Sequence, residues 1–460
     1  IENKSGELIA FRCADIVMCT GGPAGIYADS VFPECHTGTT SLALMAGAKA
    51  QNLTEWQYGL ASINPRWNVS GTYMQVLPRF VSIDEDGNEH EFLSDYFENK
   101  FEALSMIFLK GYQWPFDSKK VISGSSVIDL LVYRECVLKN RRVYLDFTRN
   151  PFGMNDIEYS KLPGEAFEYL SKAEALFGTP IERLRKMNAP AIELYKGKGI
   201  DISKEFLEIA LCAQHNNGGI AVDMWWRTSV KGLFCAGECA GTHGIARPGG
   251  SALNAGQVGS LRAAQYISEN GNKLIKEKDF EDILSKAGAK QLKELEKVCN
   301  GYDNINGLIT EAQRRMSDTA AAIRNKDNME KALALTLTEI SSLHKTAKVS
   351  ERESLYRYYK LKDVLITQSA VLTALINYAN TVGDTRGSSL CYNQNGNLRH
   401  GLEELFRFTE ENGDTRTKVQ ETVLTDSGFK SYWRDVRPIP ENDDFFENVW
   451  RSYRENKNIY

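Results

Sequence analysis

The stretch GLFCAGECAGTHGIARPGGSALNAG, residues 232–256, decides the fold. Its first residues, 232–237, are apolar and are predicted to form a buried strand. A glycine-rich loop follows at residues 243–250, and the small residues at 251–268 favour a helix. A strand, a glycine-rich loop and a helix in this order offer bare backbone amides and room for close backbone contact. The stretch therefore predicts a site that cradles a phosphate group or a cofactor.

A segment of the same character lies near the start of the chain. Residues 14–22, ADIVMCTGG, are predicted to form a buried parallel strand that ends in a Gly-Gly turn. Residues 37–51 follow with apolar positions at helical spacing and are predicted to form a helix. Many of its residues are small, which allows the helix to approach a sheet or a ligand closely.

The rest of the chain differs in character. Residues 53–205 are rich in aromatic residues, Pro and Gly, and predict a mixed domain with short strands such as 81–83 and 143–147 and a helix within 121–142. Residues 271–410 are mainly helical, with three- and four-residue apolar spacing over 319–343 and 350–380. Residues 411–460 show little periodicity, and we expect them to form an extended tail over the surface.

Composition excludes several classes of protein. The 460 residues carry 55 basic and 60 acidic side chains, a net charge of −5, so general nucleic-acid binding is not expected. No apolar run reaches the roughly 18 residues that span a bilayer, so the chain is not predicted to cross a membrane. The odd number of cysteines, nine, fits a reducing compartment, and we expect a cytoplasmic protein. Cys235 and Cys239 have neither a second cysteine pair nor a histidine cluster beside them, so no metal site is predicted.

The first residues have the pattern of a domain interior. The chain begins with Ile1, residues 3–7 are predicted to form a turn, and residues 8–12 are predicted to form a strand. We therefore expect a native amino-terminal portion upstream of Ile1.

Seven short motifs, in a shared order over about 370 residues, carry a resemblance to a known family. They are CTGG at 19–22, TGT at 37–39, VYLDFT at 143–148, HNNGGI at 215–220, GEC at 237–239, HGIARPGGSAL at 243–253 and TRGS at 385–388. In this order the chain resembles the flavoproteins of the fumarate reductase, succinate dehydrogenase and L-aspartate oxidase group.

The resemblance implies an α/β fold in which a partial Rossmann-like FAD-binding domain is interrupted by an α+β capping domain and followed by a helical domain. The implied boundaries are residues 1–52 and 206–270 for the FAD-binding domain, 53–205 for the capping domain, 271–410 for the helical domain and 411–460 for the tail. The family's GxGxxG fingerprint is absent from the 460 residues. We expect residues upstream, or a second polypeptide, to supply it.

The resemblance also implies which residues contact the cofactor, FAD. They are Thr20, Gly21, Gly22, Thr37, Gly38, Gly237, Glu238, Gly249, Gly250, Ser251, Ala252 and Leu253.

The expected reaction is reduction of the C=C bond of an α,β-unsaturated carboxylate. It needs a hydride from the flavin, a proton donor and positive charge that holds the carboxylate. Arg247 is the candidate for carboxylate binding, because a guanidinium binds a carboxylate in a bidentate manner and stays charged. His215 and His243 are candidate hydrogen-bond donors. Arg79 is the candidate proton donor, because its spacing from Gly71 matches the family's catalytic arginine segment.

Departures from the family pattern bear on the substrate. The family's Q-[FY]-H-P-T segment reads QYGLA at residues 57–61, so its histidine is Gly59 and its threonine is Ala61. The loss of these donors argues against fumarate and favours a substrate with one carboxylate and a bulkier, less polar end. Four aromatic residues either line that end or pack in the core: Trp56, Tyr58, Trp67 and Tyr73.

Two alternatives stay open from the sequence. One is an oxidase or dehydrogenase of the same family that acts on an amino acid or a dicarboxylate. The other is a non-catalytic flavin-binding or scaffold protein, which the changes at Gly59 and Ala61 would suit. An electron-transfer partner is expected for the enzyme.

Overall fold

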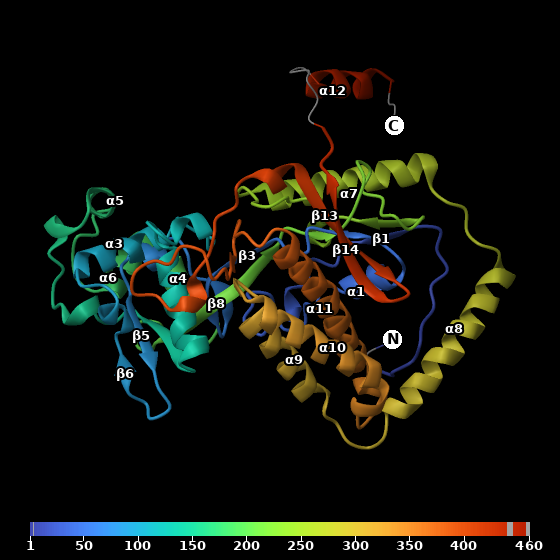
Figure 1. Cartoon of the computed structure of the whole chain (residues 1–460), viewed down its shortest axis with the longest axis horizontal. Helices are drawn as coiled ribbons and strands as arrows, with labels where there is room; N and C mark the ends of the chain where they lie inside the picture. Colours follow the sequence, from blue (N-terminus) through green and yellow to red (C-terminus); the bar gives the residue numbers. More distant parts are fainter. Residues whose placement is uncertain (3, 439–444, 457–460) are drawn as a thin grey trace.

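The computed structural model describes residues 1–2, 4–438 and 445–456 (Figure 1). The stretch that decides the fold has the expected order. Strand β10 (Leu233–Cys235) pairs in parallel with β1 (Ile16–Met18), with Met18 in register with Cys235. The 3-10 helix η7 (Gly237–Cys239) and the glycine-rich loop follow, and then helix α7 (Ser251–Asn270).

The predicted helix over 37–51 is only partly correct. Helix α1 (Thr40–Met45) ends early, because Gly47 has a φ of +94°, a left-handed conformation that breaks the helix. The chain then enters strand β2 (Ala50–Gln51).

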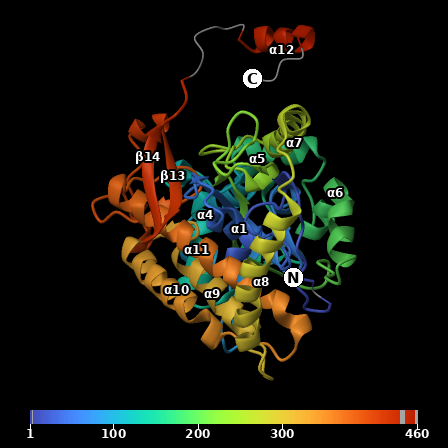
Figure 2. The ribbon, with the colours of Figure 1, turned by 90° about the vertical axis from the view of Figure 1, so that its right-hand side faces the viewer.

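The prediction of an extended tail after residue 411 is wrong over most of the described part. Strands β13 (Lys418–Thr425) and β14 (Gly428–Asp435) form an antiparallel hairpin. The hairpin joins β2 and β9 (Gly219–Ile220) in a four-stranded sheet of order β14-β13-β2-β9. Helix α12 (Phe445–Asn456) stands above α7 (Figure 2). Residues 439–444 and 457–460, also part of the predicted tail, lie outside the described residues.

A six-stranded sheet of order β4-β3-β8-β7-β5-β6 forms a separate lobe (Figure 1, left). Its strands are β3 (Trp56–Ile63), β4 (Arg66–Asn68), β5 (Arg79–Ile83), β6 (Glu89–His90), β7 (Arg142–Asp146) and β8 (Leu207–Asn216). The surrounding helices are α2 (Thr72–Gln75), α3 (Lys100–Lys110), α4 (Ser126–Tyr133), α5 (Gly164–Lys172) and α6 (Pro180–Lys196). Because β8 belongs to this sheet, the lobe extends past residue 205.

The predicted helical region is present and covers the four-stranded sheet. Its helices are α8 (Glu277–Val298), α9 (Ile305–Thr319), α10 (Lys326–Thr346) and α11 (Leu355–Thr381). Helix α11 is buried on most sides, because it packs against α9, α10, α1 and the β13–β14 hairpin. A short parallel pair, β11 (Ile323–Arg324) and β12 (Leu390–Cys391), lies beside it.

The strand predicted at residues 8–12 is not formed. These residues have no regular structure, and Phe11 is 81% exposed, because no neighbouring strand among the described residues offers them a hydrogen-bonding edge. Among the described helices, none combines the length and the apolarity that crossing a bilayer requires.

Candidate functional site

The candidate site lies where β8 ends, beside η7 and the glycine-rich loop. Nδ1 of His215 is 3.2 Å from Oε1 of Glu238, and the same oxygen accepts a 2.8 Å hydrogen bond from the backbone N–H of Asn216. Nε2 of His215 is 3.2 Å from Nδ1 of His243. Both rings are buried, at 7% and 8% exposure. The side chains of Glu238, His215 and His243 thus form a continuous hydrogen-bonded chain, which we call the His-His-Glu chain.

The electrostatics of the chain favour a neutral His243. Burial lowers the pKa of His243 to about 4, and the positive charge of His215 and of Arg247 lowers it further. Among the residues that the structure describes, none is a hydrogen-bond partner of His243 Nε2. When His215 carries protons on both nitrogens, Glu238 and His243 Nδ1 both accept, and His243 presents an N–H at Nε2.

Arg247 is held next to the chain by Gln57. Nη2 of Arg247 donates a 2.8 Å hydrogen bond to Oε1 of Gln57, and Nη1 donates to the carbonyl of Pro248 at 3.3 Å. Gln57 lies on β3, in register with His215 on β8. The Nε atom of Arg247 has no partner in the described part of the chain, and burial lowers the pKa of this guanidinium, which stays charged at neutral pH. The site therefore has an anchored cation with donor capacity to spare.

Three of the four residues predicted as catalytic, His215, His243 and Arg247, thus come together. Gln57 was missed, although it begins the segment in which Gly59 and Ala61 drew attention. A glutamine is a common core or surface residue, so only the pairing of β3 with β8 reveals it.

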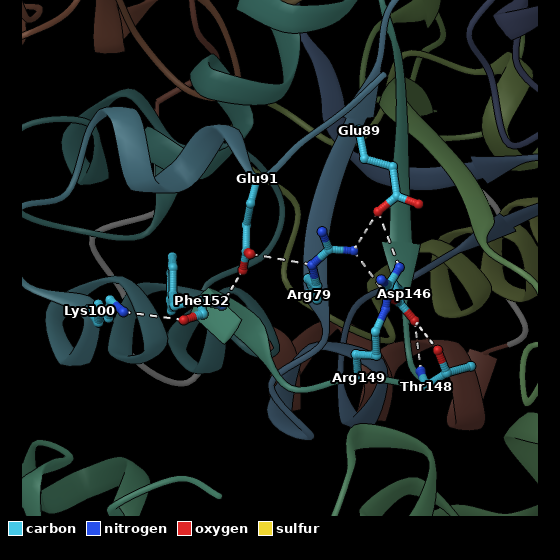
Figure 3. Close-up of polar contacts among 8 residues, drawn as sticks. All are labelled: Arg79, Glu89, Glu91, Lys100, Asp146, Thr148, Arg149 and Phe152. Atoms are coloured by element: carbon cyan, nitrogen blue, oxygen red, sulfur yellow. Dashed lines mark hydrogen bonds and ion pairs between the residues drawn. The ribbon is translucent and has the colours of Figure 1, made fainter. Parts of the chain in front are cut away.

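The fourth residue, Arg79, lies elsewhere (Figure 3). It begins β5, and its guanidinium binds Glu89 at 3.1 Å, Asp146 at 3.3 Å and Glu91 at 3.3 Å. Strand β7 lies between β5 and β8 in the sheet, so no contact joins Arg79 to the His-His-Glu chain in the described structure. The surroundings of Arg79 explain it as a structural cation, and its role as proton donor stays a prediction from the resemblance.

Trp114 occupies the space beside Gly59. A Cβ atom at Gly59 would lie 2.6 Å from Nε1 of Trp114 and 2.9 Å from Oε1 of Gln214. Both polar atoms are buried and have no hydrogen-bond partner among the described residues. A side chain of histidine size at position 59 would therefore require Trp114 to move.

The aromatic residues proposed to line the substrate have core explanations. Trp56 and Tyr58 are 1% and 0% exposed, and their polar atoms bond to Leu53 and Tyr27. Tyr73 is also buried, whereas Trp67 is 49% exposed on the outer strand β4. Core packing accounts for the first three.

A cavity of about 390 Å³ lies between the end of β1, η7 and α7. Five of the residues predicted to bind the cofactor line it: Gly21, Gly237, Glu238, Ala252 and Leu253. The other lining residues are Cys19, His215, Ala236, Gly256, Gln257 and Ser260. The His-His-Glu chain therefore borders the cavity through His215 and Glu238.

The remaining residues predicted to bind the cofactor surround this cavity. Gly22 permits the close approach of Glu238, since a Cβ at Gly22 would lie 2.4 Å from its Oε1. Gly249 and Gly250 precede α7, and a Cβ on either would meet no atom within 4 Å. Thr20 follows Cys19 directly, and Ser251 is the first residue of α7.

Thr37 and Gly38 lie at the start of α1, where α11 contributes an acid. Oδ1 of Asp363 accepts a 3.1 Å hydrogen bond from the backbone N–H of Ser41, and burial raises the pKa of this carboxyl. Its other oxygen has no partner among the described residues. Asp363 was missed, because it lies more than 300 residues from Thr39, where the resemblance predicts an aspartate.

The cavity suits a cofactor with a flat ring and hydroxyl groups. Ala236, Ala252 and Leu253 offer apolar surface, and the Glu238 carboxylate accepts hydrogen bonds from hydroxyls. The N-terminal amides of the long helix α7 carry a partial positive charge that favours electron-rich oxygens.

Comparisons with known proteins agree with this donor set. A family model described as "FAD binding domain" matches residues 1–253, more than half of the chain. The flavoprotein-like component of the fumarate reductase (CoM/CoB) of Methanothermobacter marburgensis is 27% identical over 380 residues, which cover 80% of this chain and 59% of that protein. An uncharacterized FAD-dependent oxidoreductase of Methanocaldococcus jannaschii is 30% identical over 193 residues, which cover 42% of this chain and 35% of that protein. The chain thus spans less than two thirds of the length of these relatives.

Solved structures share the fold. A quinol fumarate reductase of Escherichia coli superposes with a TM-score of 0.61 at 19% identity, over 96% of this chain and 69% of that one. The adenylylsulfate reductase of Archaeoglobus fulgidus superposes with a TM-score of 0.54 at 15% identity, over 93% of this chain and 67% of that one. At such identities the likeness concerns the fold alone.

Proposed function

The chain belongs to the family of FAD binding domains, and on this premise we propose that it is part of an FAD-dependent oxidoreductase that reduces the C=C bond of an α,β-unsaturated carboxylate. The observation that carries the proposal is the meeting of Arg247, His243 and His215 at the border of the β1–α7 cavity. A cation and two imidazoles beside a flavin site suit an organic acid better than a neutral substrate.

The cavity residues would hold FAD. Glu238 suits hydroxyl groups of the ribityl or ribose part, Gly21 and Gly237 allow close backbone contact, and the start of α7 suits electron-rich ring oxygens. When bound, the flavin supplies the hydride. We further propose that Thr20, Gly22, Thr37, Gly38 and residues 249–251 complete the cofactor site, that the six-stranded lobe caps it, and that an electron-transfer partner reduces the flavin.

Arg247 would bind the substrate carboxylate. Gln57 takes one of its amino groups, which fixes the plane of the guanidinium and leaves Nε free to donate. A fixed guanidinium both orients the carboxylate and stabilises the negative charge that develops when the double bond is reduced.

The His-His-Glu chain would supply the proton. His215 gives the proton on its Nε2 to Nδ1 of His243, while His243 releases the proton on its own Nε2 to the substrate carbon. The low pKa of His243 keeps the ring from holding both protons, so that transfer onward is favoured. Glu238 stabilises the positive charge on His215 before the transfer.

The substrate would have one carboxylate. The position of a second carboxylate-binding histidine is Gly59, and Trp114 fills the neighbouring space with an indole. An indole beside the site favours an apolar group at the far end of the substrate.

The test is reoxidation of the photoreduced, FAD-loaded protein by a panel of enoates under anaerobic conditions. We expect an enoate with one carboxylate to reoxidise the flavin faster than fumarate, and Arg247→Ala to slow that reaction by about 10²–10³-fold, as loss of one transition-state donor does. Arg227→Ala is the matched control, because Arg227 lies on a surface turn and pairs with Asp223. Absence of reoxidation by every enoate, or equal rates for both variants, would contradict the proposal.

A further inference from the structure

Two thiols lie in contact behind the cofactor cavity. Cys235 is the last residue of β10 and Cys239 the last of η7, and their side chains form a hydrogen bond. They are 0% and 2% exposed. Glu238, which lines the cavity, lies directly before Cys239 in the chain.

The surroundings of the Cys239 sulfur are polar. Sγ lies 3.1 Å from the carbonyl oxygen of Met18 and 3.1 Å from that of Ala236, and the backbone N–H of Thr20 also contacts it. A buried free cysteine usually packs as a small hydrophobe. Cys212 does so here, because it packs in a cluster with Ala61 and Ala210.

The two thiols differ in acidity. The hydrogen bond from Cys235 lowers the pKa of Cys239, and backbone N–H groups including that of Thr20 lower it further. The same contact and burial raise the pKa of Cys235. Burial likewise raises the pKa of Cys212. Cys239 is thus the sulfur that reacts as a thiolate, and Cys235 is a protonated thiol at contact distance.

We propose that Cys239 and Cys235 form a redox-active pair that a hydroperoxide oxidises to a disulfide. The Cys239 thiolate attacks the O–O bond, which breaks to give a sulfenic acid on Cys239 and, with one proton, an alcohol or water. The Cys235 sulfur then attacks the Cys239 sulfur, water leaves, and the S–S bond forms. The two thiols lose two electrons and two protons, and the O–O bond is reduced. Two small-molecule thiols reverse the change, and they leave as their own disulfide.

This pair bears on the cofactor site without depending on the proposed reaction. The disulfide would link β10 to η7 on either side of Glu238, and it would remove the hydrogen bond from Cys239 to Met18. We therefore expect the oxidised form to release FAD more readily than the reduced form.

Peptide mapping tests the proposal on the whole chain. Trypsin cleaves after Lys231 and Arg262 but not at Arg247, which precedes Pro248, so one peptide, 232–262, contains Cys235 and Cys239 and no other cysteine. After brief treatment with hydrogen peroxide and alkylation, we expect this peptide to lose two hydrogens and to escape alkylation. Cys239 should react at least about tenfold faster than Cys212, because the thiolate fraction falls tenfold for each unit of pKa.

Two variants separate the roles. Cys235→Ser removes the second thiol, so the sulfenic acid on Cys239 should accumulate and be trapped by dimedone. Cys239→Ser should leave Cys235 reduced. The proposal is overturned if peptide 232–262 keeps both thiols while the exposed Cys13, Cys19 and Cys35 oxidise, if Cys239 pairs with Cys19 instead, or if dimedone labels Cys235 in the Cys239→Ser variant.

Discussion

Nε2 of His215 lies 3.2 Å from Nδ1 of His243, and the other nitrogen of each ring has a different environment: a carboxylate for His215 and no partner among the described residues for His243. This asymmetry gives the pair a direction. A proton held near Glu238 can leave only through His243.

The pH dependence of stability should report the buried state of His243. Its pKa is about 4 in the folded protein against an ordinary value of 6.5, so between these pH values the unfolded chain binds more protons than the folded one. Stability is therefore complete above about pH 6.5 and falls as the pH is lowered to about 4. We expect His243→Gln to reduce this loss by about 1 kcal/mol, since solvent screens part of the effect. Urea unfolding of both proteins at pH 7 and pH 5 measures it, and equal losses in both would refute the assignment.

Arg79 should prove structural. Asp146 is fully buried, and its partners are Arg79 and Arg149. Removal of Arg79, which is 12% exposed, leaves Asp146 and Glu91 without their inner cation, and we expect Arg79→Ala to lower the free energy of unfolding by about 3 kcal/mol. The matched control is Arg149→Ala, which removes a 52% exposed partner of the same carboxylate and should cost under about 1 kcal/mol. Chemical denaturation compares them.

If Arg79 instead acts in proton transfer, Arg79→Lys would abolish flavin reoxidation while the stability changes little. That split between activity and stability would contradict the structural assignment.

The Glu55–Arg386 pair should couple the helical region to the site. Nη2 of Arg386 is 2.7 Å from Oε1 of Glu55, both side chains are buried, and the neighbouring Gly387 packs near Ile245 of the glycine-rich loop. Glu55→Gln leaves a buried guanidinium without its counter-charge, and we expect a loss of about 3–5 kcal/mol. Glu174→Gln, which breaks an exposed pair with Lys186, should change the stability by less than about 1 kcal/mol. Thermal unfolding distinguishes the two, and similar shifts in the melting temperature would argue against the coupling.

The sequence predicted the parts of the fold that local chemistry determines. Residues 14–22 and 232–237 form strands and 251–268 a helix, because apolar runs and glycine turns act locally. The early end of α1 and the β13–β14 hairpin were missed, since β2 is two residues long and is stabilised mainly by strands distant in sequence. The same holds for the site: His215, His243 and Arg247 lie in recognisable motifs, whereas Gln57, Trp114 and Asp363 reach it only through strand pairing and helix packing.

The contact between Gly59 and Trp114 gives a final prediction. Gly59→His places a Cβ 2.6 Å from the Trp114 indole, so we expect a loss of about 1–3 kcal/mol from overpacking. Trp114→Ala alone leaves a cavity and should cost about 3–5 kcal/mol. In the double variant the imidazole enters the space that the indole leaves, so the combined loss should be smaller than the sum of the single losses by at least about 1 kcal/mol. A double-mutant cycle from urea unfolding measures this coupling. Additive losses would mean that Trp114 does not occupy the position of the missing side chain, and the argument for an apolar end of the substrate would then fail.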